Sequence, residues 1–386
     1  MECYFDVQDL SLNKKGEELC GDKVKRLTSD DRVIVVLSDG LGSGVKANIL
    51  ATLTSEIIIT MLNADVSLEN VIETVIGTLP ICKVRNIAYA TFTILQIDKR
   101  TGAFKVINCD NPPIFLLKRG RVSQPETQTV TILGKTITVI EGTLSQGDFL
   151  GAITDGVLYA GMGVALNYGW GWQSIAKHLE GLFVTRSRTA RGIVQDVITK
   201  THSLYNGEIG DDATCVGVYV RERRGLMIFT GPPLEPSSDT QHAEELLNFE
   251  GRRVVCGGTT GSIVAEYLGE TIDTDIATLR REVPPIGLLR GIDLLTEGII
   301  TMSKALEYLR ESDGDERKLP KDRNGAQLLA TEILKADFIH LLVGQRINEF
   351  YQNPLLPKTI SIRKNLVREL EATMRDLHKE VAVEYC

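Results

Sequence analysis

Runs of apolar residues divide the first part of the chain into strand-like and helix-like segments. Residues 33–37 form a continuous apolar, β-branched run, which is typical of a buried strand. A glycine-rich turn follows, and the apolar positions of residues 45–62 then recur at helical spacing, with Ser43 available as an N-terminal cap. A second helix is predicted at residues 68–78. We expect these two helices to pack on one face of a sheet.

Most of the other segments before residue 222 are predicted strands. Turn-forming residues separate them, as expected for hairpins and short loops. Strands are predicted at residues 90–97, 103–108, 114–118, 129–132, 135–140, 148–154 and 213–220, and helices at residues 172–182 and 190–205. Many antiparallel strands with two helical pairs indicate an α+β domain over residues 1–222, built as a β-sandwich flanked by helical layers.

The pattern changes around residues 221–225, where we place a domain boundary. Beyond it, strands and helices are expected to alternate, which is typical of a smaller α/β domain over residues 225–386. A chain of 386 residues also exceeds what one core usually supports. Strands are predicted at residues 226–230, 253–256, 338–343 and 381–385, helices at 242–247, 262–268 and 292–309, and a polar loop at 311–324.

Composition narrows the classes of function. The 43 basic and 51 acidic residues give a net charge of −8, and no basic stripe with interleaved aromatic residues is present, so we expect no nucleic-acid partner. The start of the chain lacks the pattern of a secretory signal, and no run approaches eighteen uninterrupted apolar residues, so we expect no membrane partner. Seven scattered cysteines fit a reducing, cytoplasmic setting.

Four short segments, far apart in the chain, each carry an aspartate next to glycine or a second aspartate. Any one of them alone is typical of a turn. Together the four segments can bring carboxylates to a hard divalent cation. Asp212 is expected to support its turn and not to bind the cation. The segments are Cys20-Gly21-Asp22, Ser38-Asp39-Gly40-Leu41-Gly42-Ser43-Gly44, Thr154-Asp155-Gly156-Val157 and Gly210-Asp211-Asp212-Ala213-Thr214.

In this order the four segments resemble those of the PPM-type metal-dependent serine/threonine phosphatases, and in particular the bacterial branch of sporulation stage II and stress-response phosphatases. The resemblance covers residues 1–222. Leu41 stands where eukaryotic relatives have a histidine, and the bacterial branch commonly has an apolar residue there. Ala213 stands where that branch usually has methionine, which implies a change in packing beside Asp211 with the ligand kept.

The resemblance implies a role for each acidic residue. Asp39 would bridge two Mn²⁺ or Mg²⁺ ions, and the Gly40 carbonyl would help to hold one of them. Asp155 and Asp211 would complete the site of the other ion. Asp22 would bind the ion in the partner site, either directly or through water. Asp39, Asp155 and Asp211 are thus the expected catalytic set, with a water shared by the two metals attacking phosphorus.

The predicted second domain contains a glycine- and threonine-rich loop between a strand and a helix. Backbone amides at such a helix start could hold an anion, although a purely structural turn explains the loop as well. The loop matches neither the P-loop nor the dinucleotide fingerprint. Its residues are Gly257, Gly258, Thr259, Thr260 and Gly261, and they suggest a module that senses a small ligand or a partner.

Three functions follow from these patterns. The first is a protein phosphatase that acts on phosphoserine or phosphothreonine of a bacterial regulatory protein, for which the resemblance implies phosphorylated anti-sigma-factor antagonists. The second is a catalytically quiet scaffold that binds a partner through a phosphatase-like fold. The third is a small-molecule phosphate monoesterase, which needs a closed pocket where a protein phosphatase needs an open channel.

Overall fold

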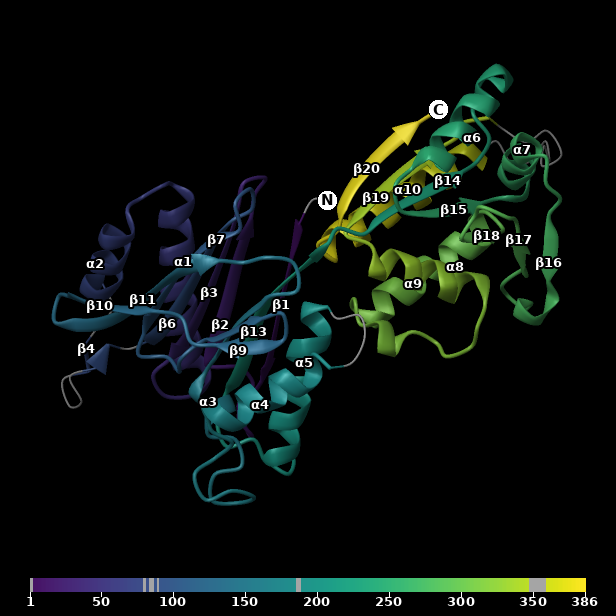
Figure 1. The fold of residues 1–386 in the computed structure, drawn as a ribbon. Helices are drawn as coiled ribbons and strands as arrows, with labels where there is room; N and C mark the ends of the chain where they lie inside the picture. The colour runs from purple at the N-terminus through teal and green to yellow at the C-terminus, as the bar shows by residue number, and fades with distance from the viewer. Residues whose placement is uncertain (1–2, 79–80, 83–86, 89, 185–188, 347–358) are drawn as a thin grey trace. The chain divides into compact units, whose positions relative to one another are not determined.

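The computed structural model describes residues 3–78, 81–82, 87–88, 90–184, 189–346 and 359–386. The chain divides into two compact units, Met1–Glu222 and Arg223–Cys386, which we call unit 1 and unit 2 (Figure 1). Each unit has its own sheets and its own buried apolar clusters. The two units are therefore described separately.

Unit 1 contains two antiparallel sheets packed face to face. Phe5, Val35, Leu95, Leu150 and Val218 come from both sheets and lie in one buried cluster, so the core of the sandwich lies between the sheets. The five-stranded sheet has the order β1 (Cys3–Leu12), β13 (Ala213–Glu222), β12 (Phe149–Ile153), β8 (Phe115–Lys118) and β9 (Arg121–Ser123). The six-stranded sheet has the order β10 (Thr127–Ile132), β11 (Lys135–Thr143), β7 (Ala103–Cys109), β6 (Ala90–Asp98), β3 (Arg32–Gly40) and β2 (Asp22–Thr28), and β4 (Ile81–Cys82) pairs with β5 (Ile87–Ala88).

Helices cover the outer face of each sheet of unit 1 (Figure 1). Helices α1 (Gly44–Asn63) and α2 (Leu68–Thr78) pack on the six-stranded sheet, and α3 (Asp155–Leu158), α4 (Trp172–Leu182) and α5 (Ala190–Leu204) pack on the five-stranded sheet. The uninterrupted apolar run of β3 follows from this arrangement. Val35 faces the other sheet, while Ile34 and Val36 face α1 and α2, so both faces of the strand are buried. The predicted α+β fold class is confirmed.

Helix α1 is unusually apolar for its length. Its most apolar 18 residues have a mean hydropathy of 1.4, enough by length and composition alone to cross a membrane, and 39% of that window is buried inside the structure. The core helix of a folded domain meets the same test. Ala47, Ala51 and Ile58 of α1 are fully buried in the core of unit 1, whereas Val45, Ile49 and Leu53 are exposed, so a core role accounts for one face of the helix.

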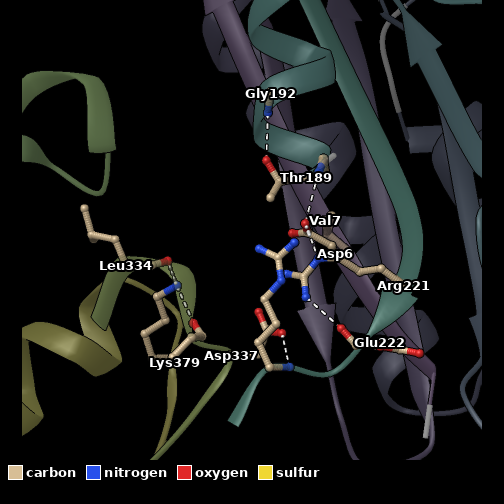
Figure 2. Close-up of polar contacts among 12 residues, drawn as sticks. Asp6, Val7, Thr189, Gly192, Arg221, Glu222, Leu334, Asp337 and Lys379 are labelled. Atoms are coloured by element: carbon tan, nitrogen blue, oxygen red, sulfur yellow. Dashed lines mark hydrogen bonds and ion pairs between the residues drawn. The ribbon is translucent and has the colours of Figure 1, made fainter. Parts of the chain in front are cut away.

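An ion pair joins the first and last strands of unit 1 to helix α5 (Figure 2). The Arg221 guanidinium donates to Asp6 over 3.0 Å, and the same carboxylate accepts a bond from the Ala190 amide at the start of α5. Thr189 caps that helix by accepting a hydrogen bond from the Gly192 amide. These contacts fix the outer edge of the five-stranded sheet.

Unit 2 is an α/β layer structure with a seven-stranded sheet. Its order is β16 (Asp273–Asp275), β17 (Ile286–Leu288), β18 (Leu294–Thr296), β15 (Arg252–Cys256), β14 (Gly225–Thr230), β19 (Phe338–Val343) and β20 (Glu380–Tyr385). The five strands from β18 to β20 are parallel, and β17 is antiparallel to both of its neighbours, β16 and β18. Helices α6 (Asp239–Asn248) and α7 (Gly258–Leu268) cover one face, and α8 (Ile299–Ser312), α9 (Gly325–Lys335) and α10 (Thr359–Asp376) cover the other.

Several predicted elements differ from the structure. Residues 292–309 were predicted as one helix, but β18 and α8 occupy this stretch with Gly298 between them. The apolar run at the start of that stretch fits either element, and its burial between β15 and β17 favours the strand. Ser43 precedes α1, but its hydroxyl donates to Glu17 and makes no cap. Strands β1 and β2 and helices α9 and α10 were not predicted.

Gly40 fixes the approach of α1 to β3 and generates a prediction about stability. A Cβ at this position would collide with the backbone of Ala47 in α1, and backbone atoms cannot give way as a side chain can. We expect Gly40→Ala to lower the free energy of unfolding by about 3 kcal/mol or more, measured by urea denaturation.

Gly77 provides the matched control. It lies in α2 with open space where a Cβ would be, so Gly77→Ala should leave stability unchanged or raise it by about 0.5–1 kcal/mol. Equal stability of the Gly40→Ala and Gly77→Ala variants would contradict this account of the packing of α1.

Candidate metal centre

The inner face of the six-stranded sheet ends in two aspartates. Asp22 and Asp39 are directly opposite each other in the β2–β3 pairing, just as Val24 is opposite Leu37 two residues further along. Side chains alternate along a strand, so Asp39 lies on the same face as Leu37, which belongs to the core between the sheets. The Gly40 amide also donates to the Gly21 carbonyl over 3.1 Å. The apolar core of the sandwich therefore ends in a pair of facing carboxylates.

The five-stranded sheet brings the other motifs to the same place. Thr154 follows β12, and its hydroxyl donates to Oδ2 of Asp22 over 2.8 Å, which joins the two sheets. The Thr214 amide of β13 donates to the same hydroxyl. Asp155, the residue after Thr154, begins α3, and Asp211 lies just before β13. Adjacent strands thus carry Asp155 and Asp211 to the end of the sandwich where Asp22 lies.

One further residue, Lys14, holds the acidic segment before β13 through two contacts. The Lys14 amide donates to Oδ1 of Asp212 over 2.9 Å, and the Lys14 ammonium lies 3.6 Å from Oδ1 of Asp211. Asp212 is buried. Neither Lys14 nor Thr154 was singled out from the sequence, although Thr154 lies inside a recognised motif.

The aspartates raise one another's pKa values. Burial raises the pKa of Asp39 to about 9, and the charges of Asp22, Asp155, Asp211 and Asp212 add to the effect. Burial also raises the pKa of Asp22 to about 7, although hydrogen bonds from Thr214 and Thr154 oppose the rise. The pKa of Asp155 is raised by burial and then by Asp211. The carboxylates are therefore close enough to repel one another strongly when ionised.

Two carboxylate oxygens in this cluster lack hydrogen-bond partners. Oδ1 of Asp22 and Oδ2 of Asp212 are buried and accept no hydrogen bond from any described residue. A buried carboxylate oxygen without a partner is costly, and a cation relieves both this cost and the repulsion between like charges. Oxygen donors of this kind suit Mg²⁺ or Mn²⁺ better than softer metals. The residues present therefore fit a divalent cation.

The spacing of the acidic groups differs between the two units. Among the described residues, the set with three ligand atoms within 4.8 Å of one another is Glu245, His340 and Glu384 of unit 2. Ion pairs account for it, since His340 lies 3.2 Å from Glu384 and His242 lies 3.2 Å from Glu245. The described aspartates of unit 1 do not form so tight a set.

The structure thus places each predicted metal-site residue of unit 1 at one end of the sandwich. These residues are Asp22, Asp39, Gly40, Asp155 and Asp211. The predicted anion-binding loop, Gly257 to Gly261, lies elsewhere, between β15 and α7 of unit 2.

Three solved structures illustrate what the chain is similar to. A structure of the PP2C phosphatase domain and a fragment of the regulatory domain of SpoIIE from Bacillus subtilis is 19% identical, with a TM-score of 0.49; the match covers 57% of this chain and 64% of that one. The RsbU and RsbW domains of Rv1364c from Mycobacterium tuberculosis are 17% identical, with 72% and 73% covered and a TM-score of 0.48. RsbX in complex with magnesium is 21% identical, with 56% and 99% covered and a TM-score of 0.41.

A family profile gives the decisive comparison. No curated protein sequence matches the chain. The profile of stage II sporulation protein E (SpoIIE) matches residues 29–221, which is half of the 386 residues and ends one residue before the end of unit 1. The predicted resemblance is confirmed: the chain belongs to the SpoIIE family, in the sporulation branch of the PPM-type phosphatases.

Proposed function

We propose that unit 1 is a divalent-cation-dependent phosphatase that removes phosphate from serine or threonine of a regulatory protein in a bacterial signalling pathway. The observation that carries this proposal is the meeting of Asp22, Asp39, Asp155 and Asp211 from four remote segments, with a buried oxygen of Asp22 left unpartnered. Membership of the SpoIIE family supports the class of reaction. A phosphorylated anti-sigma-factor antagonist is the substrate class we favour.

The four aspartates would hold two Mn²⁺ or Mg²⁺ ions, with the Gly40 carbonyl as a further oxygen donor. Cations of this kind lower the pKa of a coordinated water and offset the negative charge of phosphoryl oxygens. The chain itself keeps the carboxylates in place. Thr154 orients Asp22 by donating to Oδ2, and the Lys14 amide holds Asp212 beside Asp211.

No activated protein nucleophile is found among the described residues around the centre. Burial, followed by the charge of Asp22, raises the pKa of the Cys20 thiol to about 12, so it stays protonated at neutral pH. Burial likewise raises the pKa of Tyr205 to about 12, and its hydroxyl donates to the Gly156 carbonyl. Hydrolysis without a covalent phosphoenzyme therefore fits the site best.

An exposed apolar loop favours a protein substrate over a small phosphate ester. The loop follows α3 directly and presents Met162, Val164, Leu166 and Tyr168, of which Tyr168 is 88% exposed. A backbone bridge between Met162 and Leu166 gives it a defined shape. Clustered apolar side chains at the surface are typical of a protein-binding site, and here they begin four residues after the last residue of α3.

Removal of one site carboxylate tests the catalytic assignment. We expect Asp39→Asn and Asp155→Asn each to lower the Mn²⁺-dependent hydrolysis of a phosphoserine peptide more than about 100-fold. Loss of a metal ligand should cost at least as much activity as loss of a residue that hydrogen-bonds to a ligand. The exposed Asp30 offers a matched control, and Asp30→Asn should keep full activity. Undiminished activity in both site variants would rule out the proposed centre. Binding of a phosphoprotein without metal-dependent hydrolysis would instead support the function of a catalytically quiet scaffold.

The exposed loop generates a test of substrate class. We expect Tyr168→Ser to lower kcat/KM for a phosphoprotein about tenfold, as for loss of an interface aromatic residue, and to leave hydrolysis of a small aryl phosphate nearly unchanged. Leu133→Ser, in the turn between β10 and β11, removes another exposed apolar side chain and should affect neither substrate. Equal losses on both substrates would indicate that the loop supports the centre itself, and faster turnover of small esters than of phosphoproteins would favour a small-molecule phosphatase.

The raised pKa values generate a prediction about stability and pH. Asp22 and Asp39 bind protons more tightly in the folded chain than in the unfolded chain. Their contribution to the stability of the metal-free protein is therefore fully present below about pH 4 and is lost as the pH rises through about 7 and about 9. In chelator, we expect Tm to fall from pH 6 to pH 9, by about 2–4 °C for each kcal/mol lost.

The amide of Asp39→Asn cannot ionise, so this variant should show a smaller fall in Tm than the wild-type chain. Mn²⁺ should raise the Tm of the wild-type chain more at pH 9 than at pH 6. Scanning calorimetry of wild type, Asp39→Asn and the Asp30→Asn control measures these shifts. Identical pH profiles for all three proteins would show that repulsion at Asp39 does not limit stability.

A further inference from the structure

The parallel strands of unit 2 reverse their order at one point. In chain order they are β14, β15, β18, β19 and β20, but across the sheet they run β18, β15, β14, β19, β20. The chain therefore builds outward from β14 in one direction and then continues from β19 in the other. Helices α6 and α7 lie on one face of the sheet and α10 lies on the opposite face. In open α/β sheets, ligands bind at the carboxyl ends of the strands beside such a switch point.

Helix α7 begins at this edge of the sheet without a side-chain cap. It starts directly after β15, and its N-cap residue is Gly257, with φ +128°, a conformation that favours glycine. The eleven residues of α7 make it long enough to have a developed positive end. A helix start without a side-chain cap leaves its first backbone N–H groups available to an anion.

Thr260 supplies the second observation. It lies in the first turn of α7, is 0% exposed, and its Oγ1 has no hydrogen-bond partner among the described residues. The hydroxyl points back to the start of the helix, since Oγ1 lies 3.4 Å from the place that a Cβ on Gly257 would take. A buried hydroxyl without a partner is destabilising. A turn with a purely structural role would be served better by valine at this position.

A positive charge lies at the switch point itself. Arg363 of α10 donates through Nη1 to the Gly344 carbonyl just beyond β19, and its guanidinium occupies the space that a Cβ on Gly231, just beyond β14, would need. Burial lowers the pKa of this guanidinium, and no carboxylate among the described residues forms an ion pair with it. A partly buried arginine without a carboxylate is suited to bind a phosphate through two parallel hydrogen bonds.

The carboxylate of Glu297 also lies near the start of α7. Oε1 of Glu297, the residue after β18, lies 3.8 Å from the place that a Cβ on Gly258 would take. It would repel a second phosphate placed there, but it can accept hydrogen bonds from sugar hydroxyls, as acidic residues do in dinucleotide-binding folds. The edge thus combines donors for one anion with an acceptor for hydroxyl groups.

We propose that the carboxyl edge of the parallel sheet in unit 2 binds a nucleotide. The start of α7 with Thr260, and Arg363 across the end of β14, contact its phosphate groups, and Glu297 accepts from its ribose. The site is separate from the metal centre, so neither proposal depends on the other.

Isothermal titration of the full chain with ADP, ribose 5-phosphate and inorganic phosphate, in chelator so that unit 1 holds no cation, tests this proposal. We expect Arg363→Gln to weaken ADP binding about tenfold to a hundredfold, as for loss of a charge-assisted hydrogen bond. Thr260→Val should weaken it about fivefold to tenfold while leaving Tm of the ligand-free chain unchanged or higher, because it removes only an unpartnered hydroxyl.

Two variants on the same helices serve as controls. Ser262→Ala removes a hydroxyl of α7 that donates to the Gly258 carbonyl, and Arg368→Gln removes an exposed charge of α10. Both should keep the wild-type affinity for ADP.

The three probes separate the sources of the phosphate. Tighter binding of ADP and ribose 5-phosphate than of inorganic phosphate, with the preference reduced in Glu297→Gln, supports the nucleotide site. Inorganic phosphate binding as tightly as ADP would overturn the assignment of a nucleotide. The site as a whole is overturned if no probe binds with a Kd below about 1 mM, or if both Arg363→Gln and Thr260→Val bind ADP like the wild type.

Discussion

Repulsion among buried and partly buried aspartates is the constraint on which the account of unit 1 depends. The two sheets of unit 1 close an apolar core, and at one end that core gives way to Asp22 and Asp39, which face each other on adjacent strands. Asp155 and Asp211 add charge from the other sheet. An apolar sandwich gains nothing in stability from such a cluster. Its presence is explained by a function that requires several carboxylates in one place.

The local structure is built to hold these charges together in spite of the repulsion. A hydrogen bond from Thr154 to Asp22 crosses from one sheet to the other, and Gly40 lets α1 pack closely behind Asp39. The Lys14 side chain offers partial compensation beside Asp211. It is partly exposed and faces several carboxylates, so divalent ions are the natural source of the remaining charge.

Much of unit 1 could be predicted from the sequence because its signals are local. The apolar run of β3 and the helical periodicity of α1 are both clear in the chain, and the Asp-Gly turns mark the ends of strands. Strand β1 was not predicted, although its partial alternation of polar and apolar residues is typical of a half-buried edge strand. Strand β18 was assigned to a helix because a short buried run fits either element. The bond between Thr154 and Asp22 spans 132 residues, and no local pattern encodes it. The same holds for Arg363, which reaches the end of β14 only through the packing of α10.

The most direct test of the central claim is to measure the binding of Mn²⁺ to the full chain by titration calorimetry, in buffers of different ionisation enthalpy. If cations offset the repulsion among the aspartates, the chain binds two ions at this centre, releases protons as they bind, and binds them more tightly as the pH rises from 6 to 9, where Asp22 and Asp39 lose their protons. Mn²⁺ binding that is absent, or that releases no protons and does not change with pH, would contradict the account.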